Sequence, residues 1–112
     1  MKFSAIPGLS KEKKKLQNLL ISDRVPHAMI LSGPEGSGKL ALALAFVNLL
    51  QCDSAIDMDS CGQCEACRKT HKMIHPDVHF YFPLAGGKEY TSEEYIKDWR
   101  PAVLDNVYLN TV

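Results

Sequence analysis

The sequence has four cysteines, all between positions 52 and 67: Cys52, Cys61, Cys64 and Cys67, with the spacing C-x8-C-x2-C-x2-C. In a reducing compartment such thiols seldom form disulfides, and clustering of this kind favours a metal ion. Four thiolates complete a closed tetrahedral zinc site, which leaves no position for water. The cysteines therefore predict a structural zinc ion rather than a catalytic one.

Other uses of the cysteines stay open, namely an iron–sulfur cluster or free or redox thiols. A thioredoxin-type motif is disfavoured because the two C-x-x-C pairs share Cys64. His71 and His75 are close enough along the chain to be rival ligands, although four cysteines already fill the shell. The acidic residues between the cysteines are hard ligands, better suited to solvent than to a sulfur site. They are Asp53, Asp57 and Asp59.

A glycine-rich stretch matches the first seven positions of the phosphate-binding loop, G-x-x-x-x-G-K. Its residues are Gly33, Pro34, Glu35, Gly36, Ser37, Gly38 and Lys39. In such a loop the backbone N–H groups curl around an anion, and the following helix adds its positive N-terminal end. Lys39 would supply a positive charge to the terminal phosphates. The sequence predicts a phosphate-binding loop here.

The eighth position of the loop is Leu40, where an active loop has the Ser or Thr whose hydroxyl binds Mg²⁺. A leucine cannot ligate a hard cation, and no later apolar strand ends in an acidic residue that could supply a second metal ligand. We therefore predict that the loop does not hydrolyse nucleotide. Binding of ATP or ADP stays open because Lys39 and the backbone donors remain.

Around these motifs the hydrophobic pattern predicts alternating elements. They are a helix over 9–21 with Ser10 as N-cap, a buried strand over Ala28–Leu31, an apolar helix over Leu40–Leu50, a strand over Val78–Phe82 and a helix from Thr91 toward Trp99. The lysines at 11–15 are interpreted as a solvated helix face. This order, with the cysteines inserted between the second helix and the second strand, is typical of an α/β domain with a parallel sheet.

Composition limits the function classes. The chain has 112 residues, 46% hydrophobic and 23% charged, which suits one small globular domain. Lys+Arg and Asp+Glu each number 13, so net charge gives no general attraction to polyanions. No apolar run is long enough to cross a bilayer, and the N-terminus lacks the apolar core of a signal peptide. We expect a cytoplasmic protein without membrane contact.

A phosphate loop followed closely by this cysteine pattern resembles the bacterial DNA polymerase III clamp loader. The segments 24–28 and 75–77, which lead into the predicted strands, carry the same resemblance. It implies that 1–112 is the N-terminal part of an AAA+ P-loop domain, a parallel sheet flanked by helices, with a zinc-knuckle insertion at about 52–72. It also implies that the segment 6–8 borders the adenine of a bound nucleotide.

Within that family, the pair Lys39-Leu40 is nearer the delta-prime branch, a stator that does not hydrolyse ATP, than the tau/gamma motors. The resemblance implies a subunit that supports ATP-dependent loading of the sliding clamp onto primed DNA. Its partners would be other clamp-loader subunits, and it would meet DNA indirectly, through the complex. The alternatives are an active tau/gamma-like ATPase and a zinc-knuckle nucleic-acid-binding module. The second should show exposed aromatic residues around the cysteines, which the sequence lacks.

The two predicted strands are not neighbours in the sheet of that family. Their backbone groups would then be unpaired, and unpaired edges and exposed apolar surfaces recruit other chains. We therefore expect an N-terminal fragment of a longer subunit that self-associates, for example by exchanging strands with a second copy.

Overall fold

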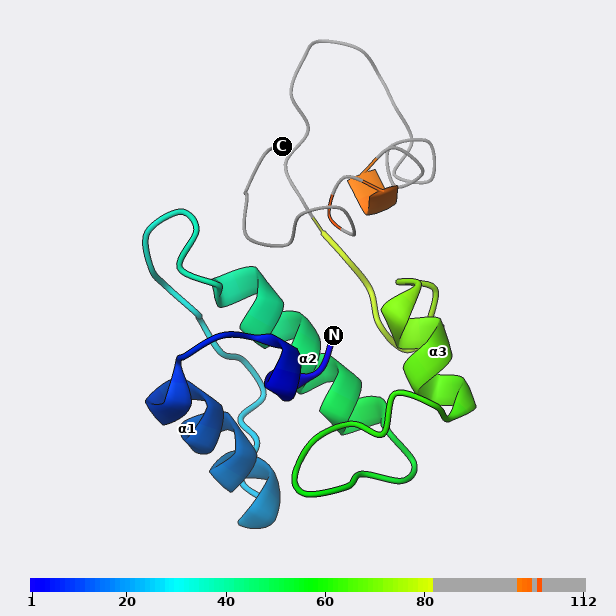
Figure 1. Cartoon of the computed structure of the whole chain (residues 1–112), viewed down its shortest axis with the longest axis horizontal. Helices are drawn as coiled ribbons and strands as arrows, with labels where there is room; N and C mark the ends of the chain where they lie inside the picture. The colour runs from blue at the N-terminus through cyan, green and yellow to red at the C-terminus, as the bar shows by residue number, and fades with distance from the viewer. Residues whose placement is uncertain (82–98, 102, 104–112) are drawn as a thin grey trace, which may run out of the picture.

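The structure, a computed structural model, describes residues 1–81, 99–101 and 103. These residues form one 3-10 turn and three labelled α-helices: η1 (Phe3–Ala5), α1 (Ser10–Ile21), α2 (Lys39–Gln51) and α3 (Glu65–His71). Residues 99–101 and 103 are helical as well. Helix α2 lies in the centre and contacts η1, α1 and α3 (Figure 1). Within the described ranges, no helix has both the length and the apolar character that a bilayer span requires.

Helix α2 confirms the apolar helix predicted over Leu40–Leu50, with one more residue at each end. Its sequence is rich in Leu and Ala, which are strong helix formers. The helix begins after Gly38, whose φ of 88° is open to glycine at little steric cost. Its buried residues occur on nearly every side: Ala41, Leu42, Leu44, Ala45, Phe46, Asn48 and Leu49. The helix is therefore a core element.

Helix α1 confirms the first predicted helix, but its N-cap is Leu9 rather than Ser10. Gly8 and Leu9 both have positive φ, so the chain reverses one residue earlier than predicted, and the Leu9 carbonyl accepts the Lys13 N–H at 2.9 Å. Leu16 is buried against the core. The exposed Lys11, Lys14 and Lys15 confirm the solvated face, whereas Lys13 is half-buried and its ammonium donates to the Ile6 carbonyl.

Two apolar clusters lie on different sides of α2. The first joins α2 to η1 and α1, and its buried members are Phe3, Ile6, Leu16, Ala41, Leu42, Ala45, Phe46 and Leu49. The second contains Leu44, Met73 and Val103, with Leu40, Phe80 and Trp99 packed against it. The rings of Phe80 and Trp99 are 5.5 Å apart between centroids. Both ends of the described chain are thus held on α2.

The predicted strand over Ala28–Leu31 is wrong for this structure. The segment lies outside any strand, and the side chain of Ile30 is 93% exposed. A strand needs a neighbour that exchanges backbone hydrogen bonds with it, and in the described ranges the only β-pairing is an isolated bridge between Ile56 and Asp59. Residues 78–81 form no strand either, while Phe82 and the helix predicted from Thr91, apart from Trp99, lie outside the described residues.

Candidate functional site

The structure brings the sulfur atoms of the four cysteines together, all within 4.8 Å of one another. The Sγ atoms of Cys61 and Cys67 are 3.8 Å apart, and those of Cys64 and Cys52 are 4.0 Å apart. In a tetrahedron with Zn–S bonds of about 2.3 Å, sulfur atoms stand about 3.8 Å apart. The cluster therefore has the size and donor set of a closed zinc site.

The local chain direction explains how the sulfurs converge. Cys52 directly follows α2 as its C-cap residue. Gly62, with φ of 74°, turns the chain so that the N–H groups of Gln63 and Cys64 both donate to the sulfur of Cys61, at 3.4 and 3.3 Å. Helix α3 then begins, and the Sγ of its N-cap residue Cys64 accepts the Cys67 N–H at 3.4 Å. The motif thus forms two consecutive turns with sulfur acceptors.

Hydrogen bonds and burial shift the pKa values of two of these thiols in opposite directions. The N–H groups of Gln63 and Cys64 lower the pKa of Cys61 to about 6, because a donor aimed at sulfur favours the thiolate. Burial raises the pKa of Cys67 to about 12. A zinc ion deprotonates the thiols that coordinate it. The cluster thus combines a thiol that ionises readily with one that needs a cation to do so.

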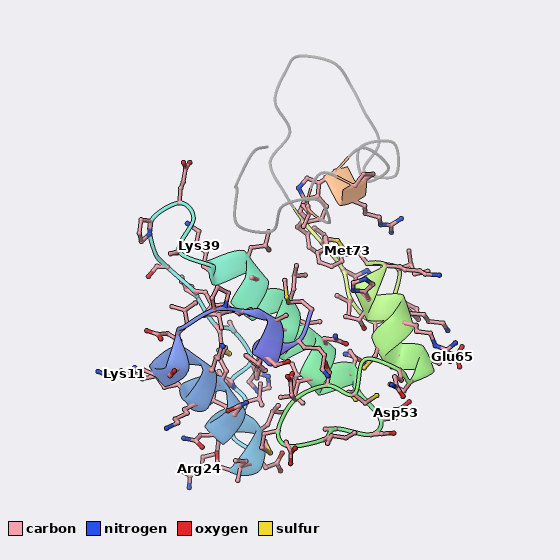
Figure 2. All side chains as sticks on the ribbon, viewed as in Figure 1. Lys11, Arg24, Lys39, Asp53, Glu65 and Met73 are labelled. Atoms are coloured by element: carbon pink, nitrogen blue, oxygen red, sulfur yellow. The ribbon has the colours of Figure 1, made fainter. Side chains whose placement is uncertain are left out.

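The predicted phosphate loop is a turn before α2, exposed over residues 33–36 and buried at Gly38 (Figure 2). Gly36 and Gly38 have φ of 76° and 88°, values that a residue with a Cβ rarely adopts. The Ser37 N–H donates to the Pro34 carbonyl at 3.2 Å. The ammonium of Lys39 donates to the Gly33 carbonyl at 2.7 Å and so spans the loop from its last residue to its first. The backbone has the glycine geometry that the pattern demands, while phosphate binding stays a prediction.

Comparison with known families decides the family of the chain. A family model described as "DNA polymerase III, delta subunit" matches residues 8–107. The chain belongs to this clamp-loader family.

Relatives of several subunit types are similar to this clamp-loader family member. It is 30% identical over 110 residues to the DNA polymerase III subunit gamma of Buchnera aphidicola, covering 98% of the chain and 28% of the relative. It is 41% identical over 58 residues to the DNA polymerase III subunit delta' of Pseudomonas aeruginosa, covering 52% of the chain and 17% of the relative. It is 34% identical over 67 residues to the DNA polymerase III subunit tau of Bacillus subtilis, covering 60% of the chain and 12% of the relative.

The chain therefore spans less than a third of the length of these relatives. No solved structure matches it significantly. The family is one of delta-type AAA+ domains, whereas the regular elements among the described residues of this member are all helices. Similarity to gamma, tau and delta' alike does not separate the delta-prime branch from the tau/gamma branch.

In this clamp-loader family member, the side chain of Leu40 packs against the cluster formed by Leu44, Met73 and Val103. The position that carries the Mg²⁺-binding hydroxyl in an active loop is thus used for apolar packing. The side chain has no oxygen to offer a metal ion. The structure adds to the prediction made from the residue type, because Leu40 is half-buried against a core cluster.

The structure corrects the interpretation of Asp59 as a solvent-facing residue. Its carboxylate accepts the N–H groups of Phe3 at 2.9 Å, Ser4 at 3.1 Å and Ser60 at 2.9 Å. Burial raises the pKa of this carboxyl, but the backbone donors outweigh burial, and the net pKa is lowered. No local pattern could have indicated these contacts, since Phe3 and Ser4 are 56 and 55 positions away. His71 is exposed and is not part of the sulfur cluster.

The two predicted sites lie at opposite ends of the same helix. Lys39 is the first residue of α2 and Cys52 follows its last residue. Figure 2 labels Lys39 and Asp53 near the two ends of this helix. A helix of 13 residues is about 20 Å long at 1.5 Å per residue. The cysteine cluster is therefore too far from the loop to take part in phosphate chemistry, which agrees with a structural metal.

Proposed function

We propose that this chain is a non-hydrolysing, stator-like clamp-loader subunit, the N-terminal part of an AAA+ P-loop domain with a zinc-knuckle insertion at about 52–72. It supports ATP-dependent loading of the sliding clamp onto primed DNA, together with other clamp-loader subunits. Family membership supports the general role. Leu40 carries the finer assignment, because a leucine at this position removes the Mg²⁺ ligand from the loop and packs against a core cluster instead.

Several features support anion binding without hydrolysis. The positive φ of Gly36 and Gly38 and the Lys39 ammonium that spans the loop support a phosphate-binding role. A bound phosphate would replace the Gly33 carbonyl as the partner of the Lys39 ammonium. Hydrolysis needs in addition a metal that bridges the phosphates, and residue 40 cannot hold it. We therefore infer a loop that can take a phosphate group but does not cleave it.

A phosphate-release assay with Mg²⁺ and ATP tests this assignment. We expect no multiple-turnover release from the chain, and the same background from Lys39→Ala. Lys11→Ala is the matched control, because Lys11 is an exposed lysine on α1, away from the loop. Turnover that is lost in Lys39→Ala and kept in Lys11→Ala would instead support the tau/gamma-like ATPase. The gamma relative, which covers 98% of the chain, makes that the second candidate.

We also propose that the chain self-associates through the segment Ala28–Leu31. The segment lies outside any strand and is exposed, with Ile30 93% exposed. An exposed apolar segment that pairs with no strand among the described residues is a template for a strand of another chain. A second copy can supply that strand.

Light scattering after size exclusion tests this association. We expect a mass above that of one chain at micromolar concentration, and a shift toward the monomer in Ile30→Lys. Ile21→Lys is the control, since Ile21 is an isoleucine 65% exposed at the end of α1. A stable, cooperatively folding wild-type monomer would contradict the proposal.

A further inference from the structure

The carboxylate of Asp59 ties two distant parts of the chain together. It accepts three backbone N–H groups, two from η1 at Phe3 and Ser4 and one from Ser60. Hydrogen bonds to an ionised acceptor are stronger than neutral ones. Asp59 thus acts as a cap for the first turn of the chain, although it belongs to the segment between the cysteines.

The turn that carries Asp59 is held by further contacts. Ile56 and Asp59 exchange two backbone hydrogen bonds, of 2.9 and 3.0 Å. Between them, Asp57 and Met58 have φ of 51° and 60°. Positive φ is uncommon outside glycine and persists where the surroundings fix it. The side-chain amide of Gln17 on α1 donates to the Met58 carbonyl at 2.9 Å, so α1 and η1 both hold this turn.

The same turn is joined directly to the sulfur cluster along the chain. It lies between Cys52 and Cys61, and the Ser60 N–H that Asp59 accepts is one residue before Cys61. The Cys61 N–H in turn donates to the sulfur of Cys52 at 3.3 Å. A shift of these sulfurs would therefore shift the backbone that carries the Asp59 carboxylate.

Through its hydrogen bonds to Phe3 and Ser4, Asp59 is also linked to the segment that follows η1. Phe3 and Ile6 are each 2% exposed and pack in the cluster on α2. The Ile6 carbonyl accepts the ammonium of Lys13. Beyond Ile6 the chain turns through Gly8, which has φ of 70°. The order of this N-terminal segment, 3–8, thus depends on contacts at both of its ends.

We propose that Asp59 is a positioning residue that couples metal binding at the four cysteines to the order of the N-terminal segment. The inference rests on the proposed zinc site and goes beyond it, because it gives the metal an effect outside the segment 52–72. Coupling of this kind is reciprocal. Zinc should order residues 3–8, and the contacts of Asp59 with Phe3 and Ser4 should raise the affinity for zinc by the same factor.

Two measurements on the whole chain test the coupling, zinc affinity by competition with a chelator and hydrogen exchange of the Phe3 and Ser4 amides. The test variant is Asp59→Asn, which keeps the shape but loses the charge and one acceptor. Asp57→Asn is the matched control, as it makes the same change two residues earlier at an exposed position with positive φ, which asparagine tolerates.

We expect Asp59→Asn to weaken zinc binding by about tenfold or more, within the range known for residues that support metal ligands, and Asp57→Asn to leave it unchanged. In the wild type, zinc removal should speed exchange at Phe3 and Ser4. In Asp59→Asn this exchange should be fast with or without zinc.

Equal zinc affinity in the two variants would overturn the coupling. So would hydrogen exchange rates at Phe3 and Ser4 of the wild type that are the same with and without zinc. The wild-type comparison needs no mutation, so it decides even if Asp59→Asn does not fold. A wild-type chain that binds no zinc would overturn the metal proposal, and the coupling with it. A chain that binds zinc without any change in exchange would overturn the coupling alone.

Discussion

Replacing Cys64 with serine is expected to reduce the zinc content from about one ion per chain to nearly none, and to unfold the segment 52–72. Cys64 has three roles in the cluster. Its sulfur is 4.0 Å from that of Cys52, its sulfur accepts the Cys67 N–H, and its backbone N–H donates to Cys61. The binding free energy of a structural zinc ion is about 10–16 kcal/mol in small zinc domains, which exceeds what this segment can gain from its few apolar contacts.

Metal analysis together with hydrogen exchange measures this result. Amides of α3 should lose protection, while those of α2 should lose much less, since α2 keeps its two apolar clusters. His71→Ala is the control. The residue lies close to Cys67 along the chain but outside the sulfur cluster, so this variant should retain one zinc ion. A disulfide among the four cysteines under reducing conditions, with no metal bound, would refute the expectation.

Phe46→Ala is expected to lower the free energy of unfolding by about 3–5 kcal/mol. Phe46 is 6% exposed and is part of the cluster that joins α2 to η1 and α1. Removing the ring leaves a cavity where three elements meet, and the loss is a large share of the roughly 5–15 kcal/mol that holds an ordinary domain together. Thermal unfolding should show a midpoint lower by at least about 12 °C.

Leu50→Ala gives the comparison on the same helix. Leu50 is 41% exposed, so its truncation should change the free energy of unfolding by less than about 1 kcal/mol. Both variants should be measured with zinc in excess, so that the metal contributes equally. Equal effects of the two substitutions would mean that the cluster around Phe46 is not the main core of the described chain.

The features that the sequence predicted correctly are local ones. The convergence of Cys61, Cys64 and Cys67 depends on the turns between them, which their spacing dictates. The burial of α2 follows from its composition, because a helix that is apolar on every side must be covered. The family assignment follows from two motifs close together along the chain, and the family model confirms it.

The features that the sequence did not predict depend on distant partners. The segment Ala28–Leu31 has an apolar composition suited to a strand, but composition cannot supply the neighbour that makes it one. The N-cap of α1 is Leu9 rather than the predicted Ser10, because the chain turns at Gly8 and Leu9. In the sequence, Asp59 cannot be told from an exposed acidic residue. Only the folded chain brings the backbone of Phe3 to its carboxylate.

Helix α2 places a limit on how the length of this chain can vary in evolution. Each residue inserted into or deleted from a helix rotates everything beyond it by about 100° and moves it by about 1.5 Å. A single insertion between Lys39 and Cys52 would therefore turn Cys52 away from its three partner sulfurs, or rotate the glycine loop relative to the clusters in which α2 packs. Substitutions inside α2 can be tolerated wherever volume is conserved. Changes in length should be confined to the loops on either side of it.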